Sequence, residues 1–261
     1  MTGFTPQARS AAGARQAEAL AIAIPADPRT PVEASWRDFV FSEVWTRPGL
    51  DRRARFVIAI VGAANAIGPQ RILESYIRAA LTLGELTLVE LREIALHITA
   101  YVGWSQAAGL DDAVTRVAED LGLEPVALAP LRSEAWTEEA RFADGEASFR
   151  KVMTSGGPPP ITAFFETGIV NYVFAELWTR AALDQRSRRL VTLVGAADSQ
   201  APQAVRSHAY SAMASGDLTK DEMLEFVMQY AIHGGHTRAS TMQALVFEMA
   251  EAIEQGLPFT R

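Results

Sequence analysis

The sequence contains no cysteine, and this absence excludes several kinds of chemistry. Without a thiol the chain forms no disulfide, performs no thiolate catalysis and builds no cysteine-based zinc site. Peroxidase activity that cycles between thiolate and disulfide is excluded for the same reason. The absence does not fix the compartment, although nothing in the sequence requires an oxidising one.

Long apolar runs and an excess of basic residues are also missing. No uncharged run approaches the roughly 18 residues of a membrane span, and the N-terminus has no basic segment followed by an apolar core. The formal net charge of -7 argues against nucleic acid or an anionic membrane as partner, because both select for Lys and Arg. We therefore expect a cytoplasmic protein whose ligand is a small molecule.

No stretch alternates strictly between apolar and polar residues as a half-buried strand does. Ala, Leu, Glu and Arg dominate from Ser35 onward, and apolar residues recur at spacings of three and four. A hydrophobic content of 49% supplies an ample core. The sequence therefore predicts an all-α fold. Helices are expected at about 6–21, 35–45, 51–67, 70–84, 88–102, 105–122, 126–142, 161–178, 184–198, 202–216, 220–234 and 236–255.

Two parts of the chain match each other position by position, which predicts a tandem repeat. The block from Trp45 to Arg55 shares Trp, Thr, Arg, Leu, Asp and two further Arg with the block from Trp178 to Arg188. A Val-Gly-Ala-Ala segment follows each block at the same spacing. Unrelated helices would share periodicity but not specific Trp, Arg and Gly positions. After one deletion the pairs are Tyr76 with His208, Glu93 with Glu225, His97 with Gln229, Tyr101 with His233, Gly103 with Gly235 and Trp104 with His236.

Proline and glycine clusters suggest where the chain is divided. Three prolines between Pro25 and Pro31 interrupt any regular element, and the cluster Ser155-Gly-Gly-Pro-Pro-Pro160 is typical of a semi-stiff connector. The expected segments are an N-terminal arm at 1–34, a first repeat at 35–142, a linker at 143–160 and a second repeat at 161–261.

The helix expected at 220–234 carries polar residues on one face. It begins with a capping box formed by Thr219 and Glu222. Glu225, Gln229 and His233 then follow at intervals of four, so they share one stripe of an otherwise apolar helix. Gly234 and Gly235 interrupt the helix just before His236. A carboxylate and two imidazoles in this arrangement suggest a functional site.

The block Trp-Thr-Arg-Pro-Gly-Leu-Asp-x-Arg-x-Arg, with the helices that follow it, resembles the carboxymuconolactone decarboxylase family of the alkylhydroperoxidase D-like superfamily. The resemblance covers both repeats, at about 35–122 and 145–255. It implies an all-α fold of two tandem helical units, a homo-oligomer, a lactone carboxylate as substrate, and neither metal nor cofactor. The superfamily's peroxidases carry Cys-x-x-Cys where Ser105–Ala108 and Thr237–Ser240 stand here, so that branch is excluded.

The four histidines lie in or beside the motif helices and differ between the two copies. The second copy alone has His233 and His236. It also has His208, at the position before the capping box where decarboxylase-type members often carry a histidine. We therefore expect the principal site in the second repeat, with His208, Glu225, His233 and His236 as catalytic residues. An open alternative for His97 is a core histidine bonded to a backbone carbonyl. The expected substrate-binding residues are Arg180, Arg188, His97, Glu93 and Trp104.

Arg47 and Arg55 recur as Arg180 and Arg188, and they allow two interpretations. A planar guanidinium captures a substrate carboxylate through two parallel hydrogen bonds. Alternatively, these arginines form ion pairs with Asp51 or Asp184, or with the motif glutamates, and tie helices together. Their position at a helix start, just after Leu-Asp, slightly favours the structural interpretation.

A cofactor-free carbon–carbon lyase that decarboxylates a lactone needs three groups. One orients the substrate carboxylate, one stabilises charge on the lactone carbonyl as carbon dioxide leaves, and one protonates the resulting dienolate. Histidine suits the last two roles, since its ordinary pKa lies near working pH. The expected roles are proton donor for His233 or His236, partner for Glu225, orienting donor for His208, and carboxylate binding for Arg180 or Arg188.

Three other functions stay open. Three histidines and a glutamate are also a plausible zinc or iron set, although His-Gly-Gly-His is not a standard metal motif. Decarboxylase-type relatives often have a proline where Ser105 and Thr237 stand, which permits a recruited isomerase, cyclase or dehydratase. A non-catalytic scaffold is the last alternative, and its marker would be a pocket filled by side chains such as Trp104 and Tyr76.

Overall fold

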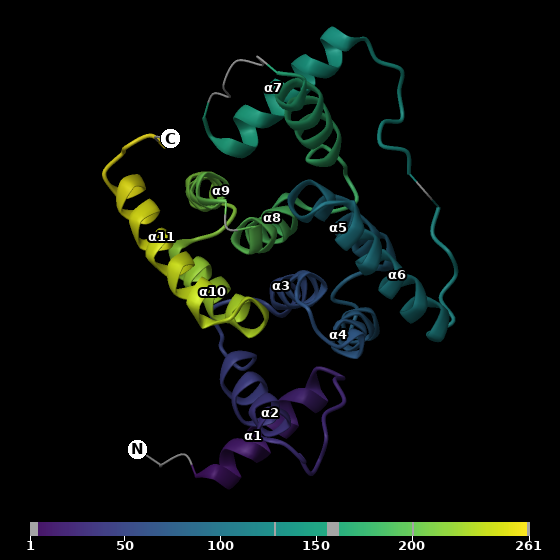
Figure 1. The fold of residues 1–261 in the computed structure, drawn as a ribbon, viewed down its shortest axis with the longest axis vertical. Helices are drawn as coiled ribbons and strands as arrows, with labels where there is room; N and C mark the ends of the chain where they lie inside the picture. The colour runs from purple at the N-terminus through teal and green to yellow at the C-terminus, as the bar shows by residue number, and fades with distance from the viewer. Residues whose placement is uncertain (1–4, 128, 156–161, 200, 260–261) are drawn as a thin grey trace.

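The structure is a computed structural model that describes residues 5–127, 129–155, 162–199 and 201–259, and its regular elements in these ranges are all helical. The predicted all-α fold is confirmed (Figure 1). The helices are α1 Pro6–Ala19, α2 Pro31–Ser35, η1 Trp36–Val44, α3 Arg52–Asn65, α4 Gln70–Thr82, α5 Leu88–Val102, α6 Trp104–Asp120, α7 Glu138–Met153, η2 Phe164–Leu177, α8 Gln185–Ser199, α9 Pro202–Ala214, α10 Lys220–Gly234 and α11 His236–Glu254.

Helices α3 and α8 lie side by side at the centre, and the other elements surround them (Figure 1). At one end of the molecule α1 packs on η1, and at the opposite end α7 packs on η2. Helix α10 packs across α3, whereas α5 packs across α8. We call α5 and α10 the motif helices. Each of them therefore packs on the central helix that belongs to the other half of the chain.

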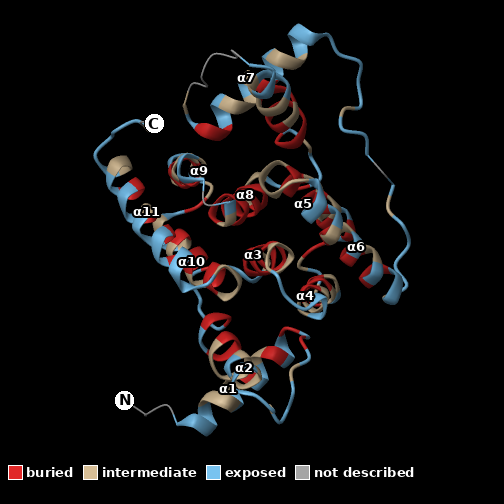
Figure 2. Ribbon diagram, viewed as in Figure 1, coloured by how far each residue is buried: buried red, intermediate tan, exposed pale blue. Residues whose placement is uncertain are grey.

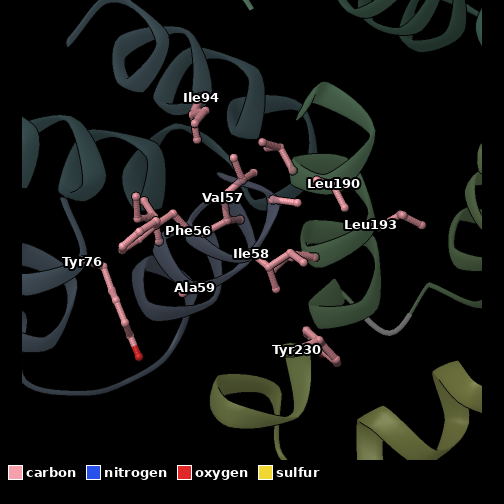
Figure 3. Close-up of a cluster of buried hydrophobic side chains, with 14 of the residues drawn as sticks. Phe56, Val57, Ile58, Ala59, Tyr76, Ile94, Leu190, Leu193 and Tyr230 are labelled. Atoms are coloured by element: carbon pink, nitrogen blue, oxygen red, sulfur yellow. The ribbon is translucent and has the colours of Figure 1, made fainter. Parts of the chain in front are cut away.

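The core is concentrated on the two central helices (Figure 2). Residues 54–62 of α3 and residues 187–197 of α8 are buried without interruption, because neighbours cover every side of each helix. Val57 and Ile58 face Leu190 and Leu193 in the same apolar cluster (Figure 3). Full burial of each such side chain contributes about 1.5–3 kcal/mol, so this contact holds α3 and α8 together.

Short polar signals fix where the motif helices begin and end. Thr87 and Thr219 each form a capping box with a glutamate three residues later. Gly103 and Gly235 end these helices with φ angles of 84° and 82°, which residues with a side chain rarely adopt. Since α6 and α11 begin at the next residue, Trp104 and His236 stand at the first position of a new helix.

The helices before the two motif tryptophans are π-helices rather than the expected α-helices. Trp45 and Trp178 directly follow η1 and η2, and the backbone N–H of each tryptophan donates to the carbonyl five residues earlier, of Val40 and Val173. The apolar spacing predicted helices here but did not distinguish their winding. Such wide turns frequently occur at functional sites in proteins.

The expected helix near 126–142 and the expected break from residue 143 are wrong. Residues 123–127 and 129–136 are irregular, and α7 runs from Glu138 to Met153 after Thr137 caps its first turn. Gly145 belongs to the expected linker at 143–160, but it lies inside α7, where a Cβ atom would come within 2.3 Å of the Val170 carbonyl oxygen. Residues 156–160, with the Gly-Pro cluster, lie outside the described residues.

Within the described ranges, none of the helices combines the length and the apolar character that crossing a bilayer requires.

Candidate functional site

The motif glutamate of α10 sits between two arginines from the first half of the chain. Arg47 Nε lies 2.9 Å from both carboxylate oxygens of Glu225, and its Nη2 lies 2.5 Å from Oε1. Arg55 Nη2 donates to Glu225 Oε2 over 3.0 Å and to the Arg47 carbonyl over 2.8 Å. We call these three residues the Glu225 cluster.

The motif glutamate of α5 makes the same arrangement with arginines from the second half. Arg180 Nε lies 2.9 and 2.8 Å from the two oxygens of Glu93, and Arg188 Nη2 lies 3.3 Å from Oε2. Burial acts to raise the pKa of Glu93, but hydrogen bonds from Arg180 and Arg188 outweigh it and lower that pKa. We call these three residues the Glu93 cluster.

All four arginines form ion pairs with the motif glutamates, while substrate binding by Arg180 and Arg188 stays a prediction. Arg55 and Arg188 are fully buried, and each also donates to a backbone carbonyl, so both are held in place by the fold. Arg180 and Arg47 sit nearer the surface, and Arg47 is about half exposed. In both outer arginines, Arg47 and Arg180, the guanidinium group could donate hydrogen bonds to a bound substrate.

The four residues expected to form one catalytic site are not brought together. Glu225 pairs with Arg47 and Arg55, His233 lies two turns further along α10 beside Tyr76, and His208 lies beside Tyr101 in the other half of the core. The reason is helix packing: α10 crosses α3, while α9 packs on α8. His236 is exposed at the start of α11, with its ring 6.3 Å from that of Phe39.

His97 is a core histidine whose proton position follows from its partners. Arg188 Nη1 lies 3.4 Å from Nδ1, and a guanidinium only donates, so Nδ1 accepts. Nε2 therefore carries the proton and donates to Thr192 Oγ1 over 3.0 Å. Burial, reinforced by the charge of Arg188, lowers the pKa of His97 well below its ordinary value. The core alternative holds, with a hydroxyl in place of the expected backbone carbonyl.

A tyrosine and a tryptophan join His97 to His208. Trp178 Nε1 donates to the Tyr101 hydroxyl over 3.1 Å, and the edge of the His208 ring meets Tyr101 at 5.6 Å. His208 is buried and its Nδ1 has no hydrogen-bond partner within the described part of the chain. Burial, with a contribution from Arg189, lowers its pKa to about 3, so the ring is neutral. Sequence reasoning did not assign Tyr101 or Trp178 to the site.

His233 aligns with Tyr101 of the other copy and Trp104 aligns with His236, and the two residues have different neighbours. His233 is half-buried between Tyr76 and Trp36, at ring distances of 5.6 and 6.0 Å, and burial lowers its pKa to about 4. Trp104 is 65% exposed and stacks on Tyr172 at 5.5 Å. Because Trp104 faces outward, it does not fill a pocket as the scaffold alternative expected, although Tyr76 is buried.

The residues expected as metal ligands, His208, Glu225, His233 and His236, do not gather at one place. Among the residues that the structure describes, no three His, Asp or Glu side chains gather in an arrangement that could hold a metal ion.

Two grooves meet at the Glu93 cluster. One, with a volume of about 940 Å³, is lined by Trp178 and Thr179, and the other, of about 730 Å³, by Thr99 and Trp104. Both are lined by Glu93, Arg180 and the irregular segment that contains Ala129. These volumes match those of sites for small organic molecules.

The outer edge of Arg180 points into this irregular segment. Its Nη1 donates to the Pro130 carbonyl over 2.6 Å, and its Nη2 to the Ala129 carbonyl over 3.3 Å. Arg47 has no such carbonyl partner among the described residues. The two clusters therefore differ at the nitrogen atoms that a substrate carboxylate would reach.

Tyr172 contacts two residues that line the second groove, Thr99 through its hydroxyl and Trp104 through its ring, and sequence reasoning missed it. Thr99 Oγ1 donates to the Leu96 carbonyl over 2.7 Å, so in its 2.9 Å contact with Thr99 the Tyr172 hydroxyl is the donor. Burial raises the pKa of Tyr172, which keeps the hydroxyl protonated. The sequence offers one slight indication of Tyr172. It aligns with Phe39, so the second copy has a hydroxyl where the first copy has none.

Comparison with known proteins gives one informative similarity. A 4-carboxymuconolactone decarboxylase of Acinetobacter baylyi is 34% identical over 87 residues, which are 33% of this chain and 63% of the relative. The chain thus spans 63% of the length of that relative. A scan against protein-family models finds no match. The similarity supports a relationship to carboxymuconolactone decarboxylases.

Proposed function

We propose that this chain is a carboxymuconolactone decarboxylase-like enzyme that acts without a cofactor on a small carboxylated lactone at the Glu93 cluster. The observation that carries the proposal is the meeting of two grooves at Arg180, whose outer edge donates to backbone carbonyls. The similarity to a decarboxylase supports the class of reaction.

A substrate carboxylate is a better acceptor for Arg180 than the carbonyls of Ala129 and Pro130, because its negative charge strengthens both hydrogen bonds. Two guanidiniums face one carboxylate in the Glu93 cluster, which leaves a net positive charge to attract the anion. In this proposal Arg180 binds substrate, while Arg188 and Glu93 fix its position.

The reaction breaks the bond between the carboxylate carbon and the lactone ring. The electron pair of that bond stays with the ring and delocalises onto the lactone carbonyl, and a proton then adds to carbon. We assign the donor role to Tyr172, which turns its hydroxyl from Thr99 toward the substrate carbon and afterwards recovers a proton from solvent water. His208 and Tyr101 lie behind Trp178 and act as positioning residues. The roles expected for Glu225, His233 and His236 stay predictions for the other cluster.

Turnover of 4-carboxymuconolactone tests this function. Arg180→Gln is expected to lower kcat/KM about 100-fold or more, since it removes the charged donor at the carboxylate. Tyr172→Phe is expected to lower kcat more than it raises KM. Arg206→Gln, which breaks a surface pair with Glu248, is the matched control and retains activity.

Unchanged turnover in folded Arg180→Gln would contradict the proposal. Formation of an isomer without loss of carbon dioxide would favour the recruited-enzyme alternative instead. Thermal unfolding of each variant separates loss of activity from loss of fold.

A further inference from the structure

The groove of about 730 Å³ along α5 and α6 has a mostly apolar lining. The two helices pack side by side, and residues 123–127 complete the lining (Figure 1). The base of the groove includes three small buried side chains, those of Ala95, Ala107 and Ala118. Because an alanine side chain ends at Cβ, it leaves a depression between the helices. We call this depression the α5–α6 groove.

Large apolar side chains that line the α5–α6 groove are in contact with water. Trp104 is 65% exposed, Leu123 is 41% exposed and Val89 is 40% exposed. Contiguous apolar surface that faces water commonly marks a binding groove, because a ligand that covers it releases the water. The lining therefore indicates a ligand with an apolar group.

One side of the α5–α6 groove is cationic. Glu93 and Arg180 line it there, and Arg188 adds a second guanidinium to the same carboxylate. The other charged residues of the lining are Arg92, Asp111 and Glu119. Arg92 and Asp111 neutralise each other, with 2.7 Å between Nη1 and Oδ1. The excess positive charge at Arg180 therefore indicates a ligand that also carries a carboxylate.

The position of Leu88 gives the length that the apolar part of this ligand needs. Leu88 also lines the groove, and it lies five residues before Glu93 in α5. Five residues correspond to about 7.5 Å of helix rise. A carboxylate at Arg180 can therefore be joined to an apolar chain of about this length that extends toward Leu88.

The matching region of the other half carries larger side chains. Leu88 and Thr115, which both line the α5–α6 groove, align with Lys220 and Phe247. Lys220 Nζ lies 5.8 Å from the centre of the Phe247 ring, so these two counterparts meet between α10 and α11. Leucine and threonine are shorter and leave this space open between α5 and α6. The exchange of side chains thus explains the groove in the first half.

We infer that the α5–α6 groove binds the apolar part of an amphipathic monocarboxylate, whose carboxylate group meets Arg180. The inference rests on the carboxylate-binding role proposed for Arg180 and extends it to the class of substrate. That substrate is a carboxylated lactone with an aliphatic or aromatic substituent, and α5 and α6 select the substituent.

Calorimetric titration of the full chain with sodium octanoate and sodium butyrate tests this inference. Both probes carry the same carboxylate, but only octanoate is long enough to extend from Arg180 to Leu88. Burial of one methylene group strengthens binding up to about fourfold, so octanoate is expected to bind about tenfold more tightly than butyrate, or better. Arg180→Gln is expected to weaken octanoate binding about tenfold or more, because the charged donor is lost.

Thr115→Phe fills the groove with the side chain that the other half has at Phe247. It is expected to weaken octanoate binding about tenfold or more and to leave butyrate binding unchanged. Thr115 is half-buried and Phe247 is 47% exposed, so the added ring need not enter the core. Phe247→Thr is the matched control and retains the octanoate affinity. If Thr115→Phe does not fold, Ala108→Phe decides, at a second lining position that is exposed.

The inference is overturned if octanoate binds no more tightly than butyrate. It is also overturned if Arg180→Gln or the folded groove-filling variant binds octanoate with unchanged affinity. Sedimentation identifies a different occupant, a second copy of this chain. An oligomer that dissociates in Thr115→Phe, together with no binding of octanoate, would overturn the inference in favour of that copy.

Turnover separates this inference from the proposed reaction. If the variants change octanoate binding as expected but no carbon dioxide leaves 4-carboxymuconolactone, only the reaction is wrong. Release of carbon dioxide by a chain that shows no preference for octanoate would instead overturn only the binding of an apolar group.

Discussion

At the scale of single residues, two buried histidines, His97 and His208, and the half-buried His233 share one property. Burial lowers the pKa values of His97, His208 and His233, to about 3 for His208 and about 4 for His233. The sequence identified these side chains, because histidine is rare here and lies beside the motif helices. It could not reveal their neutrality, which depends on neighbours such as Arg188 and Arg189.

Stability is expected to fall on mild acidification. A histidine with a lowered pKa binds its proton in the unfolded chain near pH 6.5 but not in the native protein. The contribution of each such histidine to the free energy of unfolding is therefore fully present above pH 6.5. It decreases as pH falls toward about 4, by up to about 1.4 kcal/mol per pH unit. Glu93 and Glu225 also have lowered pKa values, and their effect begins only below about pH 4.5.

Urea unfolding at about pH 7 and about pH 5.5 measures this loss. His208→Phe removes one of the protons involved, so its stability is expected to depend less steeply on pH than that of the unchanged chain. An unchanged chain with equal stability at both pH values would contradict the neutral histidines.

At the scale of elements, glycine has two structural roles, ending a helix and allowing two helices to pack closely, and the sequence did not distinguish them. Gly103 and Gly235 end helices, as predicted. Gly13 and Gly145 lie inside helices, where each lets α1 or α7 approach a π-helix closely. The linker expected at 143–160 overlaps α7, whereas the capping residue Thr219 placed the start of α10 correctly.

Alanine at these two close contacts is expected to destabilise the protein. A Cβ atom at Gly13 would lie 1.8 Å from the Arg37 carbonyl oxygen, and one at Gly145 would lie 2.3 Å from that of Val170. Backbone atoms cannot yield cheaply, so each substitution is expected to cost about 1–3 kcal/mol. Calorimetry of Gly13→Ala and Gly145→Ala measures the change in Tm.

Gly109 in α6 is the control, since a Cβ atom there meets nothing within 4 Å. Gly109→Ala is expected to raise stability by up to about 1 kcal/mol through helix propensity. Equal effects at all three positions would show that the close contacts are unimportant.

At the scale of the whole molecule, the two halves complete each other's ion pairs. Arg47 and Arg55 hold Glu225, and Arg180 and Arg188 hold Glu93. The residues of these pairs were predicted from the sequence, but their grouping was not. Spacing along one helix shows which side chains share a face, not which distant helix that face meets. The division into tandem units and the homo-oligomer stay predictions.

Neither half is expected to fold alone. Residues 1–155 leave buried Arg55 without Glu225, and residues 162–261 leave buried Arg188 without Glu93. An unpaired buried charge costs about 3–5 kcal/mol, a large part of a typical domain's stability. Cooperative unfolding is therefore expected only when both fragments are present. A cooperative transition in one fragment by itself would contradict this interdependence.

The measurement that tests the account most directly is release of labelled carbon dioxide from 4-carboxymuconolactone carrying ¹³C in its carboxylate. The account predicts that the unchanged chain and Arg206→Gln release the label, whereas folded Arg180→Gln releases it about 100-fold more slowly. No release by the unchanged chain, or equal release by Arg180→Gln, would contradict it.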